Sequence, residues 1–363
     1  MFVDEISMKD FRNYAQGGIS FSKGVNIIYG ANAMGKTNIL EAIFLICYAR
    51  SHRYARENEM IRHGSSQASI RAKFNSHGRS FEGEIKLFPN EKKQIKMNGI
   101  SIKKTSDLMG YLNAVMFCPE DLRIIKGAPR ERRRVMDFGI CQISKKYFYS
   151  LSQYIKVIEQ RNKLLKENPT DDSLWVWNEK LLKHGSDIIC MRKSFLDLIK
   201  NHAASVQKEM SGENLDIIYK SSVDIKDFSS AEAINEQFER ELKRNIEREK
   251  AFGTSLVGPH RDDFEVFINE KEAKIYGSQG QQRTAALALK IGQLLLIKEK
   301  TSQPPILLLD DVFSELDETR QSYLIDKISG MQVIITCTAL PKHSKGKKIK
   351  IEDVGGNVSA LGG

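Results

Sequence analysis

The stretch Gly30-Ala31-Asn32-Ala33-Met34-Gly35-Lys36-Thr37 decides the fold of this chain. It matches the pattern G-x-x-x-x-G-K-[ST], in which two glycines let the backbone curl until its amide hydrogens face phosphate groups. The lysine would place a positive charge beside the β- and γ-phosphates of a nucleotide, and the threonine hydroxyl would bind Mg²⁺. The stretch therefore predicts a phosphate-binding loop.

The residues on either side of the loop have the patterns that this motif requires. Residues 25–29, Val-Asn-Ile-Ile-Tyr, form a short β-branched run that is typical of a strand ending at Gly30. Beyond the loop, apolar residues recur at helical spacing, namely Leu40, Ile43, Phe44 and Cys47. Strand, loop and helix follow in order, which favours a nucleotide site over a simple glycine turn.

The composition describes a basic globular protein. The 363 residues are 41% hydrophobic and 28% charged, and the formal net charge is +10. This balance favours a polyanionic partner, with nucleic acid as the first candidate. The amino terminus lacks a signal-peptide pattern and no apolar run approaches about 18 residues, so we expect a cytoplasmic protein without a membrane partner. The five cysteines are scattered, which predicts free thiols rather than zinc or disulfide sites.

Changes of pattern along the chain predict three segments. Residues 1–126 combine the loop with short alternating stretches between 68 and 102, where Asn98-Gly99 is a hairpin signal. Residues 127–252 hold helical spacing without sustained heptads, which indicates a compact helical insertion. Residues 253–363 return to strand-like and helical patterns, and the glycine-rich tail from Gly355 is expected to be frayed.

Two carboxylates follow an apolar run near the end of the chain. Residues 306–309 read Ile-Leu-Leu-Leu, a buried parallel strand, and Asp310 and Asp311 come next. Beside a phosphate-binding loop, Asp310 would hold Mg²⁺ and Asp311 would polarise the attacking water. The structural alternative is that the pair caps a helix after a buried strand.

A second small, flexible loop stands before a predicted helix at 284–297. It reads Gly277-Ser278-Gln279-Gly280-Gln281-Gln282-Arg283, and such a loop at a helix start can bind an anion. One nucleotide does not need two such loops within one chain. The arrangement is explained if Ser278, Gly280 and Gln281 close over a nucleotide bound by a second subunit; the alternative is an ordinary helix start.

The order of these pieces resembles the RecF family, recombination-mediator ATPases related to the SMC proteins, over nearly the whole chain. The resemblance implies an α/β fold: an ABC-type P-loop ATPase head, with a mixed sheet, helices and an antiparallel β subdomain, and an inserted α-helical domain. It rests on the loop, on 277–283, and on further motifs: Phe11-Arg12-Asn13-Tyr14, Ser51-His52-Arg53, Pro119-Glu120-Asp121-Leu122, Gly127-Ala128-Pro129, Arg132-Arg133, Gly258-Pro259-His260-Arg261-Asp262 and Asp310-Asp311-Val312-Phe313-Ser314-Glu315-Leu316-Asp317.

The family resemblance also implies how the pieces work. Two subunits would form a head-to-head dimer around two ATP molecules with Mg²⁺, and hydrolysis would open it. Ser278 and Gly280 would touch the γ-phosphate held by the partner, and Ser314 to Asp317 would cross the interface, with Asp317 bridging to the partner's phosphate loop. The expected nucleotide-binding set is completed by residues outside these loops, namely Arg12, Asn13 and Asn38.

The chain departs from the wider superfamily at four points. The glutamate usual after the magnesium aspartate is Asp311, one methylene shorter, which predicts slow turnover. The histidine expected after the last core strand is replaced by the region Thr336-Cys337-Thr338. No linker glutamine can be identified, and Glu120 is the candidate for that metal-side position. The insertion also lacks the cysteine pair of a zinc hook.

Clusters of basic residues favour binding to the DNA phosphate backbone without reading of sequence. They are Arg50 with Arg53 and Arg56, Lys92 with Lys93 and Lys96, Lys103 with Lys104, Arg130 with Arg132 to Arg134, and Lys342 to Lys350.

The function expected from these features is a slow, DNA-stimulated ATPase that clamps duplex or gapped DNA as an ATP-induced homodimer. The resemblance adds RecR and RecO as partners and, indirectly, the RecA recombinase. Two other classes share the same ATP-site parts: the ATPase subunit of a transport system and an ATP-dependent nuclease.

Overall fold

The computed structural model describes residues 1–362 except 54, 168, 313–315, 341–345 and 353–356. The chain divides into two compact units. Unit 1 consists of Met1–Asp121 and Ile297–Gly363, and unit 2 of Leu122–Leu296. The nucleotide-site pieces around Gly30 and Asp310 belong to unit 1, whereas the loop around Ser278 belongs to unit 2.

The described residues of unit 1 form one twelve-stranded mixed sheet, with the strand order β7-β6-β5-β4-β1-β2-β15-β14-β3-β13-β12-β8. Part of the tail beyond Gly355, expected to be frayed, supplies β15. The strands are β1 (Phe2–Phe11), β2 (Tyr14–Ser20), β3 (Val25–Tyr29), β4 (Ala68–Ser76), β5 (Arg79–Leu87), β6 (Gln94–Met97), β7 (Ile100–Ser101), β8 (Ala114–Phe117), β12 (Ile306–Asp310), β13 (Val333–Cys337), β14 (Lys347–Ile351) and β15 (Asn357–Gly362).

The parallel part of this sheet brings the nucleotide-site segments together. Strands β14, β3, β13, β12 and β8 run parallel, and β12 and β13 are buried along their whole length. Asp310 pairs with Thr336, and Thr336 pairs with Ile28. Because the carboxyl ends of parallel strands meet at one edge, the loop after β3 lies beside the end of β12, as the sequence predicted.

The antiparallel part confirms the alternating pattern between 68 and 102. Strands β1, β2, β4, β5, β6 and β7 pair antiparallel. Asn98 and Gly99 form the turn between β6 and β7, with φ of 48° and 79°. Two positive φ angles are what a tight type I′ hairpin turn requires, so this pair fixes the register of the two short strands.

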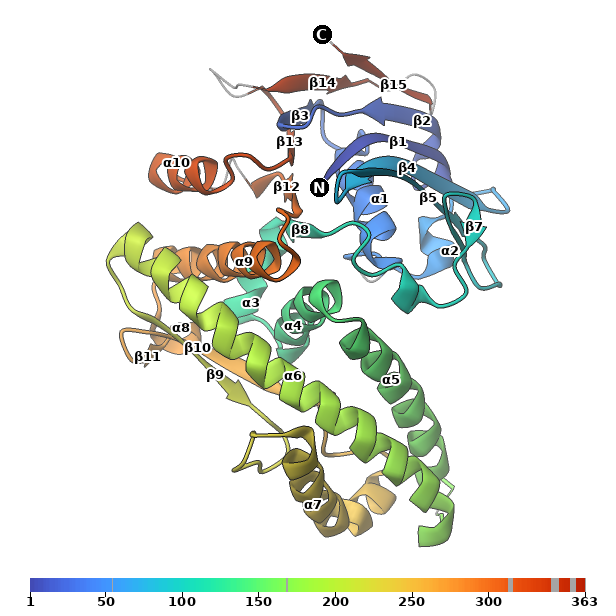
Figure 1. The fold of residues 1–363 in the computed structure, drawn as a ribbon, viewed down its shortest axis with the longest axis vertical. Helices are drawn as coiled ribbons and strands as arrows, with labels where there is room; N and C mark the ends of the chain where they lie inside the picture. The colour runs from blue at the N-terminus through green and yellow to red at the C-terminus, as the bar shows by residue number, and fades with distance from the viewer. Residues whose placement is uncertain (54, 168, 313–315, 341–345, 353–356, 363) are drawn as a thin grey trace. The chain divides into compact units, whose positions relative to one another are not determined.

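Helix α1 (Lys36–Tyr48) begins in the phosphate loop and packs on the sheet, with contacts to β1, β4, β5, β8, β12 and β13 (Figure 1). Its residues from Ile39 to Tyr48 are all buried, so its environment is a core rather than a surface. The remaining helices of unit 1 are short: α2 (Glu57–Met60), α10 (Glu318–Lys327), and the 3-10 turns η1 (Thr105–Asp107) and η2 (Pro119–Leu122), the last at its border.

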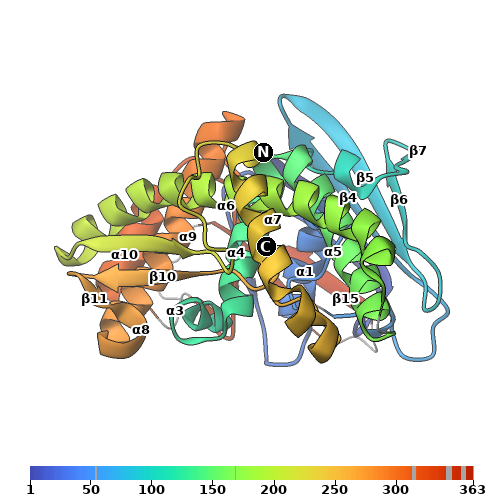
Figure 2. The same cartoon turned by 90° about the horizontal axis from the view of Figure 1, so that it is seen from below.

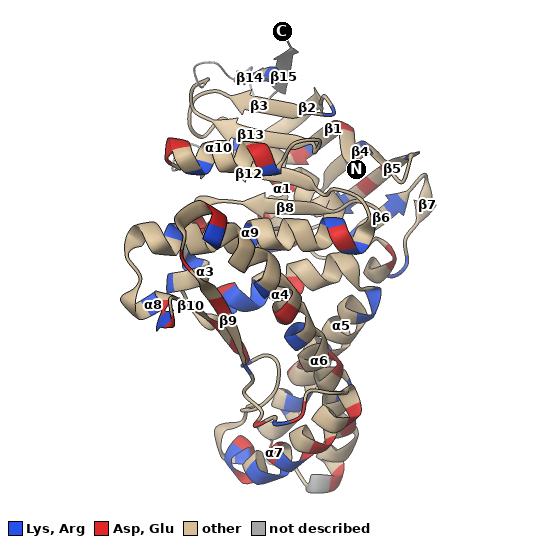
Figure 3. Ribbon diagram, turned by 60° about the vertical axis from the view of Figure 1, so that its left-hand side comes forward, with Lys and Arg blue, Asp and Glu red and all other residues tan. Residues whose placement is uncertain are grey.

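Unit 2 is mainly helical and carries a small sheet of order β11-β10-β9. The 41-residue helix α6 packs against both α5 and α7 (Figure 2), and α7 carries charges of both signs (Figure 3). Its elements are α3 (Arg123–Lys126), α4 (Pro129–Ile143), α5 (Lys145–Leu165), α6 (Asp171–Ser211), β9 (Leu215–Lys220), α7 (Ala231–Phe252), β10 (Asp263–Ile268), β11 (Lys271–Glu272), α8 (Ala273–Tyr276) and α9 (Gln279–Thr301, which runs past Leu296).

The two units do not coincide with the predicted segments 1–126, 127–252 and 253–363. Strand β9 lies inside the predicted insertion, yet it pairs with β10, which lies beyond residue 253. This pairing holds 253–296 in unit 2, so the predicted third segment is shared between the units. Among the described helices, none is both long and apolar enough to cross a membrane.

Candidate nucleotide-binding site

The phosphate loop needs its two glycines for steric reasons. Gly35 has a φ of 90°, and a Cβ there would lie 2.6 Å from Oδ1 of Asn13. At Gly30, a Cβ would lie 2.6 Å from the carbonyl oxygen of Ile351. Both positions therefore demand a residue without a side chain. The loop ends at Gly35, the N-cap of α1, so the amide groups at the positive end of that helix face the loop.

Lys36 is held over the loop by the loop's own backbone. Its Nζ donates to the carbonyl oxygens of Gly30 at 2.8 Å and Ala31 at 2.9 Å, and only 4% of the residue is exposed. An ammonium group has three donors, so one remains for a phosphate oxygen. These two hydrogen bonds fix the side chain over the loop, and a fixed side chain has a lower entropy cost when it binds an anion.

Thr37 and Asp310 meet at the sheet edge, 273 residues apart in sequence. The Thr37 hydroxyl donates to Oδ1 of Asp310 at 2.8 Å, and Thr336 donates to the same oxygen at 2.8 Å. Burial raises the pKa of Asp310, and the two hydroxyl donors oppose that shift. A hydroxyl and a carboxylate oxygen are ligands that Mg²⁺ accepts, so the pair fits the metal that the motif implies.

Asp311 adopts a left-handed backbone conformation with a φ of 52°. Its backbone N–H donates to Oγ1 of Thr336 at 3.0 Å, so Thr336 supports both aspartates. This role was missed, because the sequence offered Thr336 only as the replacement for an expected histidine. A non-glycine residue held at positive φ beside a buried carboxylate is typical of functional sites.

Replacing Thr336 with valine, which keeps its shape, is expected to lower kcat for ATP hydrolysis about tenfold with little change in ATP affinity. The substitution removes a donor to Asp310 and leaves the Asp311 N–H without this acceptor, at a cost of about 1–3 kcal/mol in stability. Steady-state ATPase kinetics measure the change in kcat, and denaturant unfolding measures the change in stability. The control is Thr105→Val, on a threonine of η1 outside the segments of the nucleotide site; equal kcat in both variants would contradict the assignment.

Glu120 does not reach this pair. It follows β8, whose Phe117 pairs with Leu309 of β12, so it stands near the same sheet edge. The side chain is exposed, and within the described ranges no hydrogen bond or ion pair joins it to Thr37 or Asp310. Groups of three or more acidic, histidine or cysteine side chains that could hold a metal are absent from the described part of the chain. A metal-side role for Glu120 stays a prediction.

Arg12 anchors the other side of the loop through a buried carboxylate. Its guanidinium donates to both oxygens of Glu41, at 2.9 and 2.7 Å, and to the carbonyl of Glu59 at 2.8 Å. Glu41 is fully buried and also accepts from Ser51. Burial raises the pKa of Glu41, but the bonds from Arg12 and Ser51 and the charge of Arg12 outweigh it, and the pKa lies below its ordinary value.

Asn13 and Asn38 connect the loop to a neighbouring cavity. Nδ2 of Asn38 donates to Oδ1 of Asn13 at 2.8 Å, and Arg53 donates to Oδ1 of Asn38 at 3.3 Å. With Arg12 they line a cavity of about 660 Å³, the size of a small-molecule site. The same cavity is lined by residues that the sequence had not singled out, among them Arg62 and His63.

In unit 2 the loop before α9 is closed by a reciprocal cap. The N–H of Ser278 donates to Oε1 of Gln281 at 2.8 Å, and the N–H of Gln281 donates to Oγ of Ser278 at 3.2 Å. This reciprocal pair is a capping box, which begins a helix. The loop therefore also serves as an ordinary helix start, which was the alternative interpretation of 277–283. Ser278 and Gly280 are exposed, which suits a loop that meets another molecule.

Asp317 caps a helix of its own subunit. It is the N-cap of α10, where its side chain accepts from the N–H of Arg320 at 2.9 Å and pairs with the Arg320 guanidinium. Its proposed bridge to a partner subunit remains a prediction. Within the predicted interface segment 314–317, residues 314 and 315 lie outside the described residues, as do 342–345 of the last basic cluster.

In the predicted DNA-contacting cluster, Arg130 with Arg132 to Arg134, the assignment of Arg132 is wrong, because its guanidinium is committed to the fold. Arg132 is buried and forms a two-pronged ion pair with Asp263, at 2.6 and 2.8 Å. Arg133 donates to the carbonyl of Asp262 at 2.6 Å, and Arg134 pairs with Glu131. Arg132 and Arg133 therefore hold α4 against the start of β10, whereas the pair of Arg134 lies within α4 itself.

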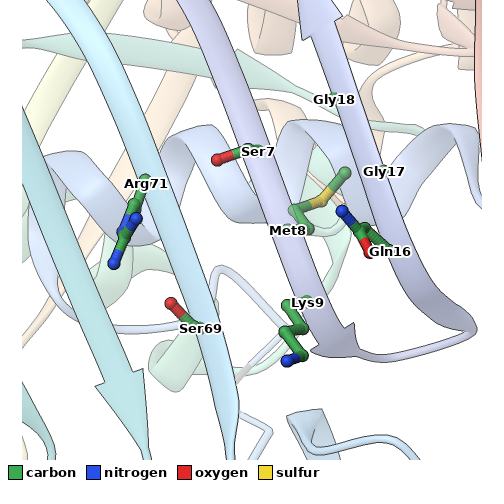
Figure 4. A pocket seen from close by; sticks show the side chains of 8 residues that line it. All are labelled: Ser7, Met8, Lys9, Gln16, Gly17, Gly18, Ser69 and Arg71. Carbon is green, nitrogen blue, oxygen red and sulfur yellow. The ribbon is translucent and has the colours of Figure 1, made fainter.

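A different basic surface is present on the sheet of unit 1. A shallow pocket of about 700 Å³ lies across β1, β2 and β4, floored by small residues such as Ser7, Gly18 and Ser69 (Figure 4). Lys9 on β1 and Arg71 on β4 border it and are exposed. Neither belongs to a sequence cluster, because residues on adjacent strands become neighbours only in the sheet.

The mixed sheet, the phosphate loop on α1 and the Thr37–Asp310 contact define the ATP-binding head of an ABC-type P-loop ATPase. The model of the RecF/RecN/SMC N-terminal domain matches residues 2–351. The chain belongs to the RecF family. It is 44% identical over 346 residues to the DNA replication and repair protein RecF of Lachnoclostridium phytofermentans. The matched stretch covers 94% of this chain and 93% of that protein.

Other relatives agree with this membership. The DNA replication and repair protein RecF of Thermoanaerobacter pseudethanolicus is 41% identical over 349 residues, covering 95% of this chain and 96% of that one. A solved structure of the recombination mediator protein RecF with ATP superimposes with a TM-score of 0.92 at 37% identity, covering 99% and 97% of the two chains. The Smc head of Pyrococcus furiosus, 16% identical with a TM-score of 0.57, shares the fold.

Proposed function

We propose that this protein is a slow ATPase of recombinational DNA repair whose ATP-bound homodimer clamps duplex DNA near single-strand gaps. The observation that carries the proposal is the Thr37–Asp310 hydrogen bond beside Lys36, in a chain whose relatives are DNA replication and repair proteins. The pair supplies a metal site next to a phosphate cradle, and the relatives supply the context of DNA repair. The proposed place of action is the cytoplasm.

In this proposal the loop 30–37 and Asn38 hold the phosphates of ATP. Lys36 would place its remaining hydrogen between the β- and γ-phosphates. Thr37 and Asp310 would hold Mg²⁺, which would neutralise charge on the phosphates. Asp311 orients and polarises the attacking water. Arg12 and Asn13 line the cavity beside the loop, where the nucleoside would lie.

The second half of each site comes from the partner subunit. Ser278 and Gly280 contact the γ-phosphate held by that subunit, Gln281 supports their loop, and Asp317 bridges to its phosphate loop. Asp311 is one methylene shorter than glutamate, so the water is held less closely and turnover is slow. Hydrolysis removes the γ-phosphate that joins the two subunits, and the dimer opens.

The DNA contact is proposed to be sequence-independent and to favour duplex and gapped DNA. The net charge of +10 supports attraction to phosphates, which carries no base information. The partners proposed from the family are RecR and RecO, with the RecA recombinase as the protein finally loaded. One solved relative is described as part of the RecFOR pathway, which supports RecR and RecO as partners.

The proposal is tested by mixing the protein with gapped duplex DNA, ATP and Mg²⁺. Dimerisation measured by light scattering and salt-sensitive DNA binding should both require ATP, and DNA should stimulate ATP hydrolysis. Stimulation only by a membrane fraction would instead indicate a transport ATPase. Cleavage of labelled DNA in Mg²⁺ or Mn²⁺ would indicate a nuclease.

Removing Lys9 and Arg71 together is expected to weaken binding to all duplex sequences equally. Each cation that contacts a phosphate contributes about 0.9 to the slope of log affinity against log salt. Arg71 is paired with Glu84 at 2.9 Å and must leave that pair to reach a phosphate, so the double variant should lose about 1 to 2 from the slope. Fluorescence anisotropy from 50 to 300 mM salt measures it. Lys243→Ala with Arg244→Ala, two exposed cations on α7, is the control; an unchanged slope in the Lys9 and Arg71 variant would exclude this surface.

A further inference from the structure

The orientation of one side-chain amide fixes the Ser278 loop. Oε1 of Gln281 accepts the backbone N–H of Ser278 at 2.8 Å, so its Nε2 must point the opposite way. An amide carries its acceptor and its donors on opposite sides, and a half-turn of the group would place donor against donor at Ser278. The loop geometry therefore depends on whatever binds Nε2.

That partner is Glu213, which stands just beyond the end of the long helix α6. Nε2 of Gln281 donates to Oε1 of Glu213 at 2.6 Å. The other carboxylate oxygen accepts from Nε2 of Gln207 at 3.2 Å and from Oγ of Ser211 at 3.1 Å. Gln207 is fully buried, so Glu213 is itself held by a fixed part of α6. Because an ionised carboxylate can only accept hydrogen bonds, Glu213 selects the orientation in which Nε2 of Gln281 faces it.

We propose that Glu213 is a positioning residue for the ATPase reaction, which holds Ser278 ready for a nucleotide bound by a second copy of this chain. The inference rests on the proposed function. Oγ of Ser278 accepts from Gln281, so its own hydrogen remains available to a γ-phosphate oxygen. Glu213 thus joins the end of α6 to the loop 277–283 through a single amide.

The test is Glu213→Ala in the full chain. We expect kcat for ATP hydrolysis to fall about 10- to 100-fold, because a small displacement of a group that binds the reacting phosphate has an effect of this size. ATP affinity of the monomer should not change, since the phosphate loop lies in unit 1. Glu239→Ala, on a half-exposed glutamate of α7 paired with Lys243, is the matched control and should keep full kcat.

A double exchange separates positioning from general stability. In Glu213→Gln with Gln281→Glu, the new amide at 213 can donate to the new carboxylate at 281, whose second oxygen can accept the Ser278 N–H. This pair should recover most of the lost kcat, whereas Gln281→Glu alone places two carboxylates together and should not. Failure of the exchange to recover more activity than Gln281→Glu alone would overturn the inference.

Amide hydrogen exchange tests the role of Glu213 in the monomer, so this measurement does not depend on dimerisation. Without ATP, Glu213→Ala should speed exchange at 278–281 at least tenfold, while the same peptide in Glu239→Ala stays as in the wild type. If the wild type fails to dimerise with ATP, the proposed function is wrong. The exchange rates at 278–281 then test the role of Glu213 without reference to the dimer. Wild-type kcat together with wild-type exchange in Glu213→Ala would refute the inference.

Discussion

Lys36→Arg is expected to lower ATP hydrolysis by about 10²- to 10³-fold, the usual effect of removing one donor that stabilises a transition-state charge. The ammonium of Lys36 sits between two loop carbonyls, at 2.8 and 2.9 Å, and the residue is 4% exposed. A planar guanidinium is larger and cannot enter the same cradle as a compact point charge. The charge is retained, so the loss would come from geometry.

The same substitution is expected to remove ATP-dependent dimerisation and ATP-dependent DNA binding. In the proposed clamp, the γ-phosphate joins the loop of one subunit to Ser278 of the other, so a loop that cannot position the phosphate also cannot join the subunits. The measurements are ATPase kinetics, light scattering with ATP, and anisotropy on gapped duplex DNA at two salt concentrations.

The matched control for Lys36→Arg is Lys73→Arg, an exposed lysine on β4 of the same unit that pairs with Glu5. It should leave all three measurements unchanged. A Lys36→Arg protein that lost hydrolysis yet bound DNA normally with ATP present would separate the phosphate loop from DNA binding, and the ATP-switched clamp would have to be abandoned.

The parts of the fold that the sequence predicted depend on short-range patterns. The β-branched run before Gly30, the apolar residues of α1 and the Asn98-Gly99 turn each describe their own segment, and each is present as expected. The meeting of Thr37 with Asp310 was also predictable, because parallel strands place their carboxyl ends together. These features need no knowledge of how distant segments pair.

The features that the sequence did not predict depend on such pairing. Strand β9 pairs with β10 although the 22-residue helix α7 lies between them in the sequence. This pairing places the boundary of unit 2 beyond residue 253. From the sequence alone, Arg132 is typical of a surface cation. The structure pairs it with Asp263, which is 131 residues away in the sequence. Thr336 and Glu213 carry no motif of their own, and only their hydrogen bonds to Asp310 and Gln281 reveal them.

Arg12→Ala is expected to destabilise the folded protein by about 3–5 kcal/mol, the usual effect of leaving a buried charge without its partner. Glu41 is fully buried on α1, and Arg12 supplies both prongs of its ion pair. Denaturant unfolding at pH 7.5 measures the loss. Arg71→Ala is the control, because its pair with Glu84 lies at the surface and contributes about 0–1 kcal/mol.

The effect of Arg12→Ala should also depend on pH, with a sign set by Glu41. In the wild type the folded pKa of Glu41 is lowered, so its contribution is present above the ordinary glutamate value of about 4.3 and is lost as the pH falls through the lower folded value. Without Arg12, burial raises that pKa, and the folded variant takes up a proton instead of keeping a buried charge. The gap in unfolding free energy should therefore be larger at pH 7.5 than at pH 4.5. A gap that stays constant over this range would show that Arg12 acts through packing rather than through the charge of Glu41.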